Sequence, residues 1–477
     1  MSLTNQKKNQ HLLCRAAFGP MAENVNELSH VSQKDLYELL EKTSSKKPDP
    51  LLIANGARDG LVKGIQDLGR MQKLTTEQKK QLRKQSVGDI KNLNLAWLTE
   101  MIDSEAQLRE KMSLFWHGHF ACRVVNIYFQ QQLLNIIREN ALGNFGDLLR
   151  EVSKSPAMLS FLNNQQNKKQ HPNENFAREV MELFTMGRGN YTEKDVKEGA
   201  RAFTGWGFNL SGEFVERPFL HDTGTKTFLG KTGNFDGDDV IDIILEQKGT
   251  PKFIAGKIYK YFVNERPDDE KITALANRFY QNNYDLKKLM NDIFLSEWFY
   301  DEKNIGTRIK SPVELIAGVR RLIPMELERP EMQLLFQRVL GQVLFYPPNV
   351  AGWPGGRNWI DSSALMFRMR LPQILTDAAE FLINPKDDDD AMMGREGVDK
   401  MLQAKRLNVN VDWDAVVKVF DNTSKENLEQ KINEFVLQTK SSINPNVLKR
   451  YIDNTSREGF IKSAMVELMS TPEYQLC

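Results

Sequence analysis

Three carboxylates and an arginine gather on one side of a predicted helix in the middle of the chain. On a helical wheel at about 100° per residue, Glu174, Glu179 and Glu182 lie with Arg178 opposite the apolar residues of the stretch 172–207. Glu179 and Glu182 are neighbours at i, i+3. In apolar surroundings they can hold a divalent cation or share a proton, because like charges raise one pKa. The alternative is a solvated face on which Arg178 neutralises Glu174 and Glu182.

Two histidines, His117 and His119, flank a single glycine earlier in the chain. On a regular helix their side chains point apart and cannot hold one ion together. In an extended segment they share a face, and neutral imidazoles are common ligands of divalent metals. The alternative is that one histidine packs beside aromatic neighbours while the other is solvated. A third candidate, His221, precedes Asp222 in a glycine turn, where the carboxylate favours an Asx turn.

The segment 346–360 is a stiff loop rich in proline, glycine and tryptophan. Its prolines and glycines exclude both a helix and a central strand. Trp353 and Trp359 can stack a sugar or an aromatic ligand, and Arg357 can clamp an anion. The alternative is a buried plug with both tryptophans in the core, since large aromatic residues are mostly packing residues.

Other chemistry finds no support in the sequence. The segment 231–237 lacks the spacing of a phosphate-binding loop, and 236–239 lacks that of a calcium loop. There is no nucleophile elbow for a serine hydrolase. The three cysteines are too far apart to predict a disulfide framework or a zinc knuckle. The strongest prediction of a reactive centre therefore remains the set of histidines and glutamates.

Charge and hydropathy limit the partners. Lys and Arg number 64 and Asp and Glu number 63 in 477 residues, so the net charge is +1 and gives no electrostatic case for binding nucleic acid or an anionic membrane. No apolar run is long enough to predict a transmembrane helix. The first residues carry no apolar segment typical of a secretory signal, so we expect a cytoplasmic protein unless a partner exports it.

The elements that must position these residues are predicted to be mainly α-helical, in a multi-helical, bundle-like protein. Glycine-punctuated aromatic and β-branched runs at 205–235 predict a small β-hairpin insertion. We expect a helical core over residues 1–383, a linker over 384–397 and a helical C-terminal tail over 398–477 that packs on the core.

Eight blocks of the sequence resemble a known bacterial family, the domain of unknown function 1800 family. They are HLLCRAAFG at 11–19, KMSLFWHGHFA at 111–121, PNENFAREVMELFTMGRGNYTEKDV at 172–196, ARAFTGW at 200–206, HDTGTKTFLG at 221–230, KSPVELIAGVR at 310–320, PPNVAGWPGGRNWI at 347–360 and STPEYQ at 470–475. The chain departs from the resemblance at Phe184, where many members carry His, and at Cys14, where many carry Arg.

The resemblance implies a mostly helical protein but no activity. It also implies a candidate partner, because genes of the family often lie beside those of a second family related to sulfatases and alkaline phosphatases. Two functional hypotheses follow. The first is a hydrolase-like enzyme with a polar site and a candidate divalent metal, built from His117, His119, Glu174, Arg178, Glu179, Glu182 and His221. The second is a non-enzymatic binding or export partner of the sulfatase- or phosphatase-like protein, with the tryptophan loop as its contact surface.

Overall fold

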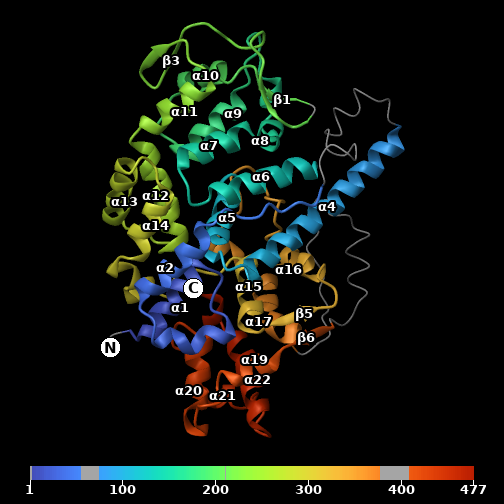
Figure 1. The fold of residues 1–477 in the computed structure, drawn as a ribbon, viewed down its shortest axis with the longest axis vertical. Coiled ribbons are helices and arrows are strands. Elements are labelled where there is room, and N and C mark those ends of the chain that lie inside the picture. Colours follow the sequence, from blue (N-terminus) through green and yellow to red (C-terminus); the bar gives the residue numbers. More distant parts are fainter. Residues whose placement is uncertain (1–2, 55–74, 210, 377–407) are drawn as a thin grey trace.

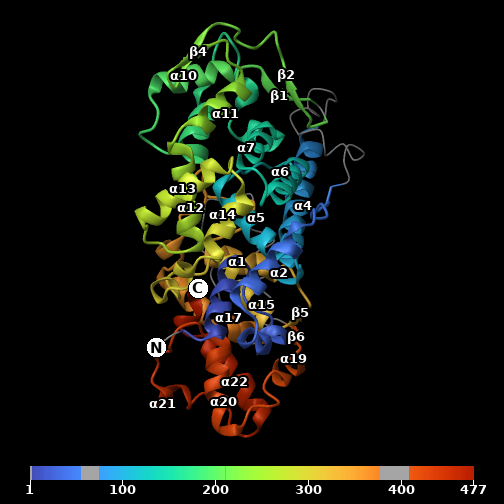
Figure 2. The same cartoon turned by 60° about the vertical axis from the view of Figure 1, so that its left-hand side comes forward.

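Helices form most of the chain in the computed structural model, which describes residues 3–54, 75–209, 211–376 and 408–477. The fold is mainly α, as predicted, and the described residues contain three small two-stranded antiparallel sheets. The molecule is elongated, with the first hairpins at one end and the last helices at the other (Figures 1 and 2). Among the residues described, we find no helix with the length and apolar character needed to cross a membrane.

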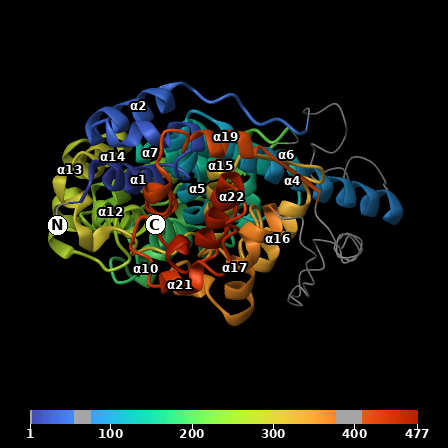
Figure 3. The same cartoon turned by 90° about the horizontal axis from the view of Figure 1, so that it is seen from below.

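Polar caps set where the N-terminal helices begin. Thr75 and Gln78 form a capping box at the start of the long helix α4, which extends beyond its neighbours on one side (Figure 3). Asn144 accepts hydrogen bonds from the first turn of α7, as the sequence predicts. The helices are α1 (Asn5–Ala16), η1 (Ala22–Ser29), α2 (Gln33–Ser45), α4 (Thr76–Asp103), α5 (Gln107–His119), α6 (Ile127–Asn140), α7 (Phe145–Lys154), α8 (Pro156–Phe161) and η3 (Asn164–Gln166).

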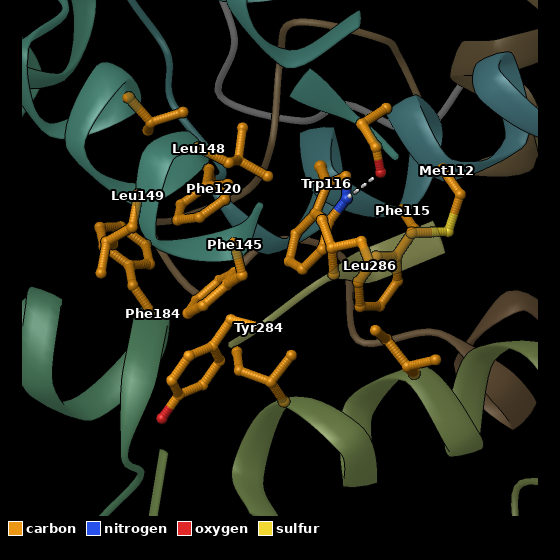
Figure 4. Close-up of a cluster of buried hydrophobic side chains, with 14 of the residues drawn as sticks. Met112, Phe115, Trp116, Phe120, Phe145, Leu148, Leu149, Phe184, Tyr284 and Leu286 are labelled. Carbon is orange, nitrogen blue, oxygen red and sulfur yellow. Dashed lines mark hydrogen bonds between the residues drawn. The ribbon is translucent and has the colours of Figure 1, made fainter. Parts of the chain in front are cut away.

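A large apolar core fixes helix α5 in the middle of the molecule. Trp116 of α5 and Phe120, which follows the helix directly, pack with Phe145 of α7 and with Phe184, and all four side chains are buried (Figure 4). The indole of Trp116 donates a hydrogen bond of 3.1 Å to the carbonyl of Ala141, so its polar atom is also satisfied. This packing holds the end of α5, including both of its histidines, in a fixed position.

The central stretch is not the single helix from Glu174 to Phe184 that the sequence predicts. It comprises α9 (Glu174–Glu179), the π-helical turn η4 (Val180–Thr185) and α10 (Glu193–Ala202). The wider turn arises because the Met186 N–H donates to the carbonyl five residues earlier, and the Thr185 hydroxyl donates to the Val180 carbonyl at 2.6 Å. The predicted capping box at the start of α10 is confirmed.

The predicted β insertion at 205–235 is confirmed as two short hairpins. Strand β1 (Trp206–Phe208) pairs with β2 (Phe214–Glu216), and β3 (Lys226–Phe228) pairs with β4 (Lys231–Gly233). Both hairpins lie at the end of the molecule that carries α9, α10 and α11 (Figure 1).

The second half of the chain adds a further apolar core and a sheet that the sequence did not predict. In that sheet β5 (Met325–Leu327) pairs with β6 (Val409–Val411), across a long separation in sequence. The other elements are α11 (Gly237–Glu246), α12 (Gly249–Phe262), α13 (Asp269–Gln281), α14 (Leu286–Phe294), η5 (Glu297–Tyr300), η6 (Glu302–Asn304), α15 (Pro312–Leu322), α16 (Met332–Leu340), η7 (Gly356–Trp359) and α17 (Ser362–Thr376).

The last helices share the second core with α4 and α15–α17. Ile432 and Met465 are buried in one cluster with Ile316 of α15, so the described part of the predicted tail packs on the helices before it. The predicted linker, 384–397, lies outside the described residues. The helices are α19 (Trp413–Lys418), α20 (Lys425–Val436), α21 (Pro445–Leu448), α22 (Arg457–Met469) and η9 (Glu473–Gln475).

Candidate functional site

The carboxylate face of α9 and η4 forms surface ion pairs. Arg178 bonds Glu174 at 3.2 Å and Glu193 of α10 at 2.7 Å. Glu182 accepts a 2.7 Å hydrogen bond from the Tyr191 hydroxyl, which lowers the pKa of the carboxyl. Partial burial, followed by the charge of Glu182, raises the pKa of Glu179. All four site residues predicted here are half-buried, and none lines the cavity described below.

His221 lies in the hairpin unit, away from the other histidines. Its Nδ1 is 2.9 Å from the carbonyl of Thr204, so the ring N–H donates to the backbone. Asp222 accepts from the Gly224 N–H at 2.8 Å, which is the predicted Asx turn, and pairs with Arg201 at 2.7 Å. These contacts hold the hairpins on α10 and account for both residues structurally.

His117 and His119 do not lie in an extended segment, because α5 continues through His119. The two rings therefore have different partners. His117 Nε2 accepts from the Phe345 N–H at 3.2 Å, while His119 Nε2 lies 3.0 Å from the carbonyl of Phe184. Burial lowers the pKa of His117 to about 3 and holds the pKa of His119 well below its ordinary value. Both imidazoles are neutral at pH 7.

The predicted metal centre does not assemble in this geometry. In the part of the chain that the structure describes, no three His, Cys, Asp or Glu side chains are grouped so that they could hold a metal ion. The reason is that α5 turns its two histidines apart, while Glu174 and Glu182 are held in ion pairs with Arg178 and Arg188. The prediction that the histidines and glutamates come together to hold a metal ion was therefore wrong. Its residues were His117, His119, His221, Glu174, Glu179 and Glu182.

A cavity of about 240 Å³ does bring three of the predicted residues together. Its walls come from α5, α12, the segment before α15 and the tryptophan loop. It includes His119, Trp353 and Trp359, but not His117 or Arg357. The lining residues used below are His119, Lys257, Lys260, Tyr261, Glu265, Arg308, Trp353 and Trp359. This cavity is the candidate functional site.

Lys257 of α12 is the most unusual group in the cavity. Its ammonium lies 3.2 Å from Nδ1 of His119 and donates at 3.1 Å to the carbonyl of Leu183. Among the described residues it forms no ion pair with a carboxylate, although the Phe253 ring lies 4.8 Å away. Burial, followed by the charge of Lys260, lowers the pKa of Lys257 to about 8.

The π-helical turn supplies the two carbonyls that orient this pair. Residues at the end of a helix have no intrahelical partner for their carbonyls. The carbonyl of Leu183 accepts from Lys257, and the carbonyl of Phe184 faces His119 Nε2. Because a carbonyl only accepts, Nε2 carries the imidazole proton and Nδ1 presents its lone pair to Lys257. The central stretch therefore contributes to the site through its backbone and not through its carboxylates.

The charged groups around the cavity favour an anion. Lys257 and Lys260 are on one face of α12 at i, i+3, and neither forms an ion pair with a described residue. Glu265 is the single acidic side chain among the residues that line the cavity, and it forms no ion pair with a described residue. Arg308 also lines the cavity, but its guanidinium is occupied by a carboxylate beneath it.

That carboxylate is Glu314, which is buried in a network of cations. It accepts from Arg308 at 2.6 Å and 2.9 Å and also bonds the ammonium of Lys111. Burial alone would raise the pKa of Glu314, but Arg308 and Lys111 outweigh it and hold the pKa well below its ordinary value. The Arg308 guanidinium also lies 4.3 Å from the Tyr261 ring. Two members of this network, Arg308 and Tyr261, line the cavity.

Close glycine contacts press the tryptophan loop against α5. Gly352 has a φ of 78°, and a side chain there would collide with the carbonyl of Gly118. The Trp353 ring lies 5.7 Å from His117, which packs behind it. Trp359 is buried at 7% exposure, whereas Arg357 is exposed. Both sequence interpretations therefore apply in part: the loop is a packed plug, and its indoles also face a cavity.

Sequence analysis missed the lysines of the cavity. In the sequence, Lys257 and Lys260 are typical of the polar face of a helix. Only their like charges at i, i+3 distinguish them from other surface lysines. Nothing in the sequence indicates that the tryptophan loop and Lys257 line one cavity, because the two are far apart along the chain.

The comparisons with known proteins give a family without an activity. A family model described as "Protein of unknown function (DUF1800)" matches residues 11–476. No curated protein and no solved structure matches the chain. The match includes every residue of the cavity. The chemistry of the site must therefore be argued from its own side chains.

Proposed function

The chain belongs to the DUF1800 family, whose description assigns no activity, and we propose that the protein binds a small anionic molecule in this cavity. That molecule would carry a flat ring or a sugar ring. The observation that carries the proposal is the ammonium of Lys257, which borders a cavity of about 240 Å³ and has no carboxylate partner among the described residues. Buried charges are normally paired, so an anionic ligand would supply the negative partner that the Lys257 ammonium lacks.

The indoles favour a ring beside the anion. Trp353 and Trp359 line the same cavity as Lys257. Aromatic side chains bury a large apolar area and favour stacking with flat partners. A ligand of this kind would set its ring against the indoles and its charge toward Lys257 and Lys260.

Calorimetric titration with three probes tests this function. We expect phenyl phosphate to bind more tightly than inorganic phosphate, and phenol to bind weakly. Lys257→Met should weaken both phosphates by about tenfold or more, because a hydrogen bond to a charged group contributes about 1.5–3 kcal/mol. Trp353→Ala should remove the advantage of phenyl phosphate over phosphate, a loss of about two- to tenfold.

Lys252→Met is the matched control, since Lys252 is an exposed lysine of the same helix and does not line the cavity. It should bind all three probes as the wild type does. Equal binding of phenyl phosphate by the wild type and Lys257→Met would contradict the proposal, as would no binding at all.

A metal-dependent hydrolase has no support in the geometry of the described residues, because its candidate ligands lie apart. A binding or export partner related to sulfatases and phosphatases stays a prediction, with residues 346–360 as its contact surface. Co-purification of the two proteins, compared between the wild type and a Trp353→Ala, Arg357→Ala variant, would test it.

A further inference from the structure

Lys257 has the surroundings of a reactive amine as well as those of an anion receptor. Its Nζ contacts the lone pair of His119 Nδ1 at 3.2 Å and a backbone carbonyl at 3.1 Å. Both partners accept hydrogen bonds, and neither carries a negative charge. A lysine that serves only in structure usually has a carboxylate beside it or extends its ammonium into water. Among the described residues the Lys257 amine has no carboxylate beside it, and it borders a cavity.

The arrangement of the three groups follows the logic of an activated nucleophile. Lys257 is the amine, His119 is the neighbouring acceptor, and the Phe184 carbonyl fixes the ring of His119 at 3.0 Å. His119 is thus a positioning residue, held by a backbone atom of the π-helical turn. The cavity leaves room in front of the amine for a small molecule.

We propose that Lys257 forms an imine with an anionic aldehyde or α-keto acid bound in this cavity. The proposal rests on the anion-binding function above and names the class of its ligand. The neutral amine attacks the carbonyl carbon, a C–N bond forms, and a proton moves from nitrogen to the former carbonyl oxygen. Loss of one water then gives the C=N bond, so the step needs no oxidant or reductant.

The charges around Lys257 keep its amine available. The groups that face the cavity from its walls are His119 of α5, Lys260 and Tyr261 of α12, Glu265, and Arg308 before α15. Arg308 is neutralised by Glu314, and burial keeps His119 neutral. Burial and Lys260 lower the pKa of Lys257 to about 8, so about a tenth of the amine is neutral at pH 7.

Reductive trapping tests the imine on the full chain. The protein is incubated with glyoxylate and cyanoborohydride at pH 7, and labelled lysines are identified by peptide mass spectrometry. We expect Lys257 to be labelled at least about tenfold faster than Lys252, because the neutral fraction of an ordinary lysine is far smaller. Phenyl phosphate should protect Lys257 and leave Lys252 unaffected.

Lys257→Arg separates this inference from the binding function. Arginine keeps the cation but not the nucleophilic amine. The variant should retain measurable binding of phenyl phosphate and lose the labelling at this position. If wild-type Lys257 is labelled no faster than Lys252 while phenyl phosphate still binds, the imine is overturned and the anion site stands. If phenyl phosphate does not bind either, both proposals fail.

Discussion

Glu314→Gln is expected to lower the free energy of unfolding by about 3–5 kcal/mol, because removing one partner of a buried ion pair leaves the other charges unpaired. Glu314 is 3% exposed and is bonded by Arg308 and Lys111, which are themselves buried. Its carboxylate also accepts from the Ser311 N–H at 2.8 Å in the capping box of α15. A glutamine can keep part of that cap but cannot neutralise two cations.

Urea unfolding of the wild type and the variant at pH 7 measures this effect. The control is Glu38→Gln, which breaks an ion pair with Lys34 whose side chains are 55% and 71% exposed. Exposed pairs contribute at most about 1 kcal/mol, so the control should unfold close to the wild type. A Glu314 variant as stable as the control would show that the buried network does not contribute to the stability of the protein.

The same carboxylate gives a pH dependence. Its pKa in the folded state is held below the ordinary value of about 4.3. A depressed carboxyl pKa contributes stability that is fully present above the unfolded pKa and is lost as the pH falls toward the folded one. The stability gap between wild type and Glu314→Gln should therefore narrow progressively below about pH 4.3.

In contrast to Glu314→Gln, Lys257→Met is expected to raise the free energy of unfolding, by about 1–2 kcal/mol at pH 7. Burial of the ammonium, seen in a pKa of about 8, costs up to about 3 kcal/mol relative to an ordinary lysine. The variant avoids this cost but loses the hydrogen bond to the Leu183 carbonyl, which lowers its free energy of unfolding by about 1 kcal/mol. A functional group held at a cost in stability is typical of a ligand site.

The sign of this effect can be checked by pH. Between about pH 8 and 10.4 the unfolded lysine keeps its proton while the folded one has lost it, so wild-type stability rises with pH. Methionine does not titrate, and the advantage of the variant should disappear near pH 10.4. Unfolding midpoints of both proteins at pH 7 and pH 10 measure it. A destabilised variant at pH 7 would mean that the ammonium has a stabilising partner in the folded protein.

Local features of the fold were predictable because short-range chemistry sets them. The caps at Asn144 and Thr192, the Asx turn at Asp222 and the hairpin insertion all depend on residues a few positions apart. The π-helical turn was not predictable, because its wider hydrogen bonds leave the amphipathic pattern of 174–184 unchanged.

The site was only partly predictable, since its parts meet through tertiary contacts. Histidines and tryptophans attract attention by their chemistry, and His119, Trp353 and Trp359 do share a cavity. The predicted glutamate site does not form a metal centre, and two of its members, Glu174 and Glu182, are paired with nearby arginines and Tyr191. Lys257 meets His119 and the Leu183 carbonyl from segments distant in sequence, and no local pattern reports contacts of that kind.

Titration of Lys257 by NMR, in protein labelled at the lysine ε-carbons, tests the central claim most directly. We expect one lysine signal that titrates near pH 8 and is missing from Lys257→Met. Its pKa should rise when inorganic phosphate is added, because an anion favours the ammonium. A Lys257 that titrates near 10.4 with the exposed lysines, or whose pKa does not respond to phosphate, would contradict an anion site in this cavity.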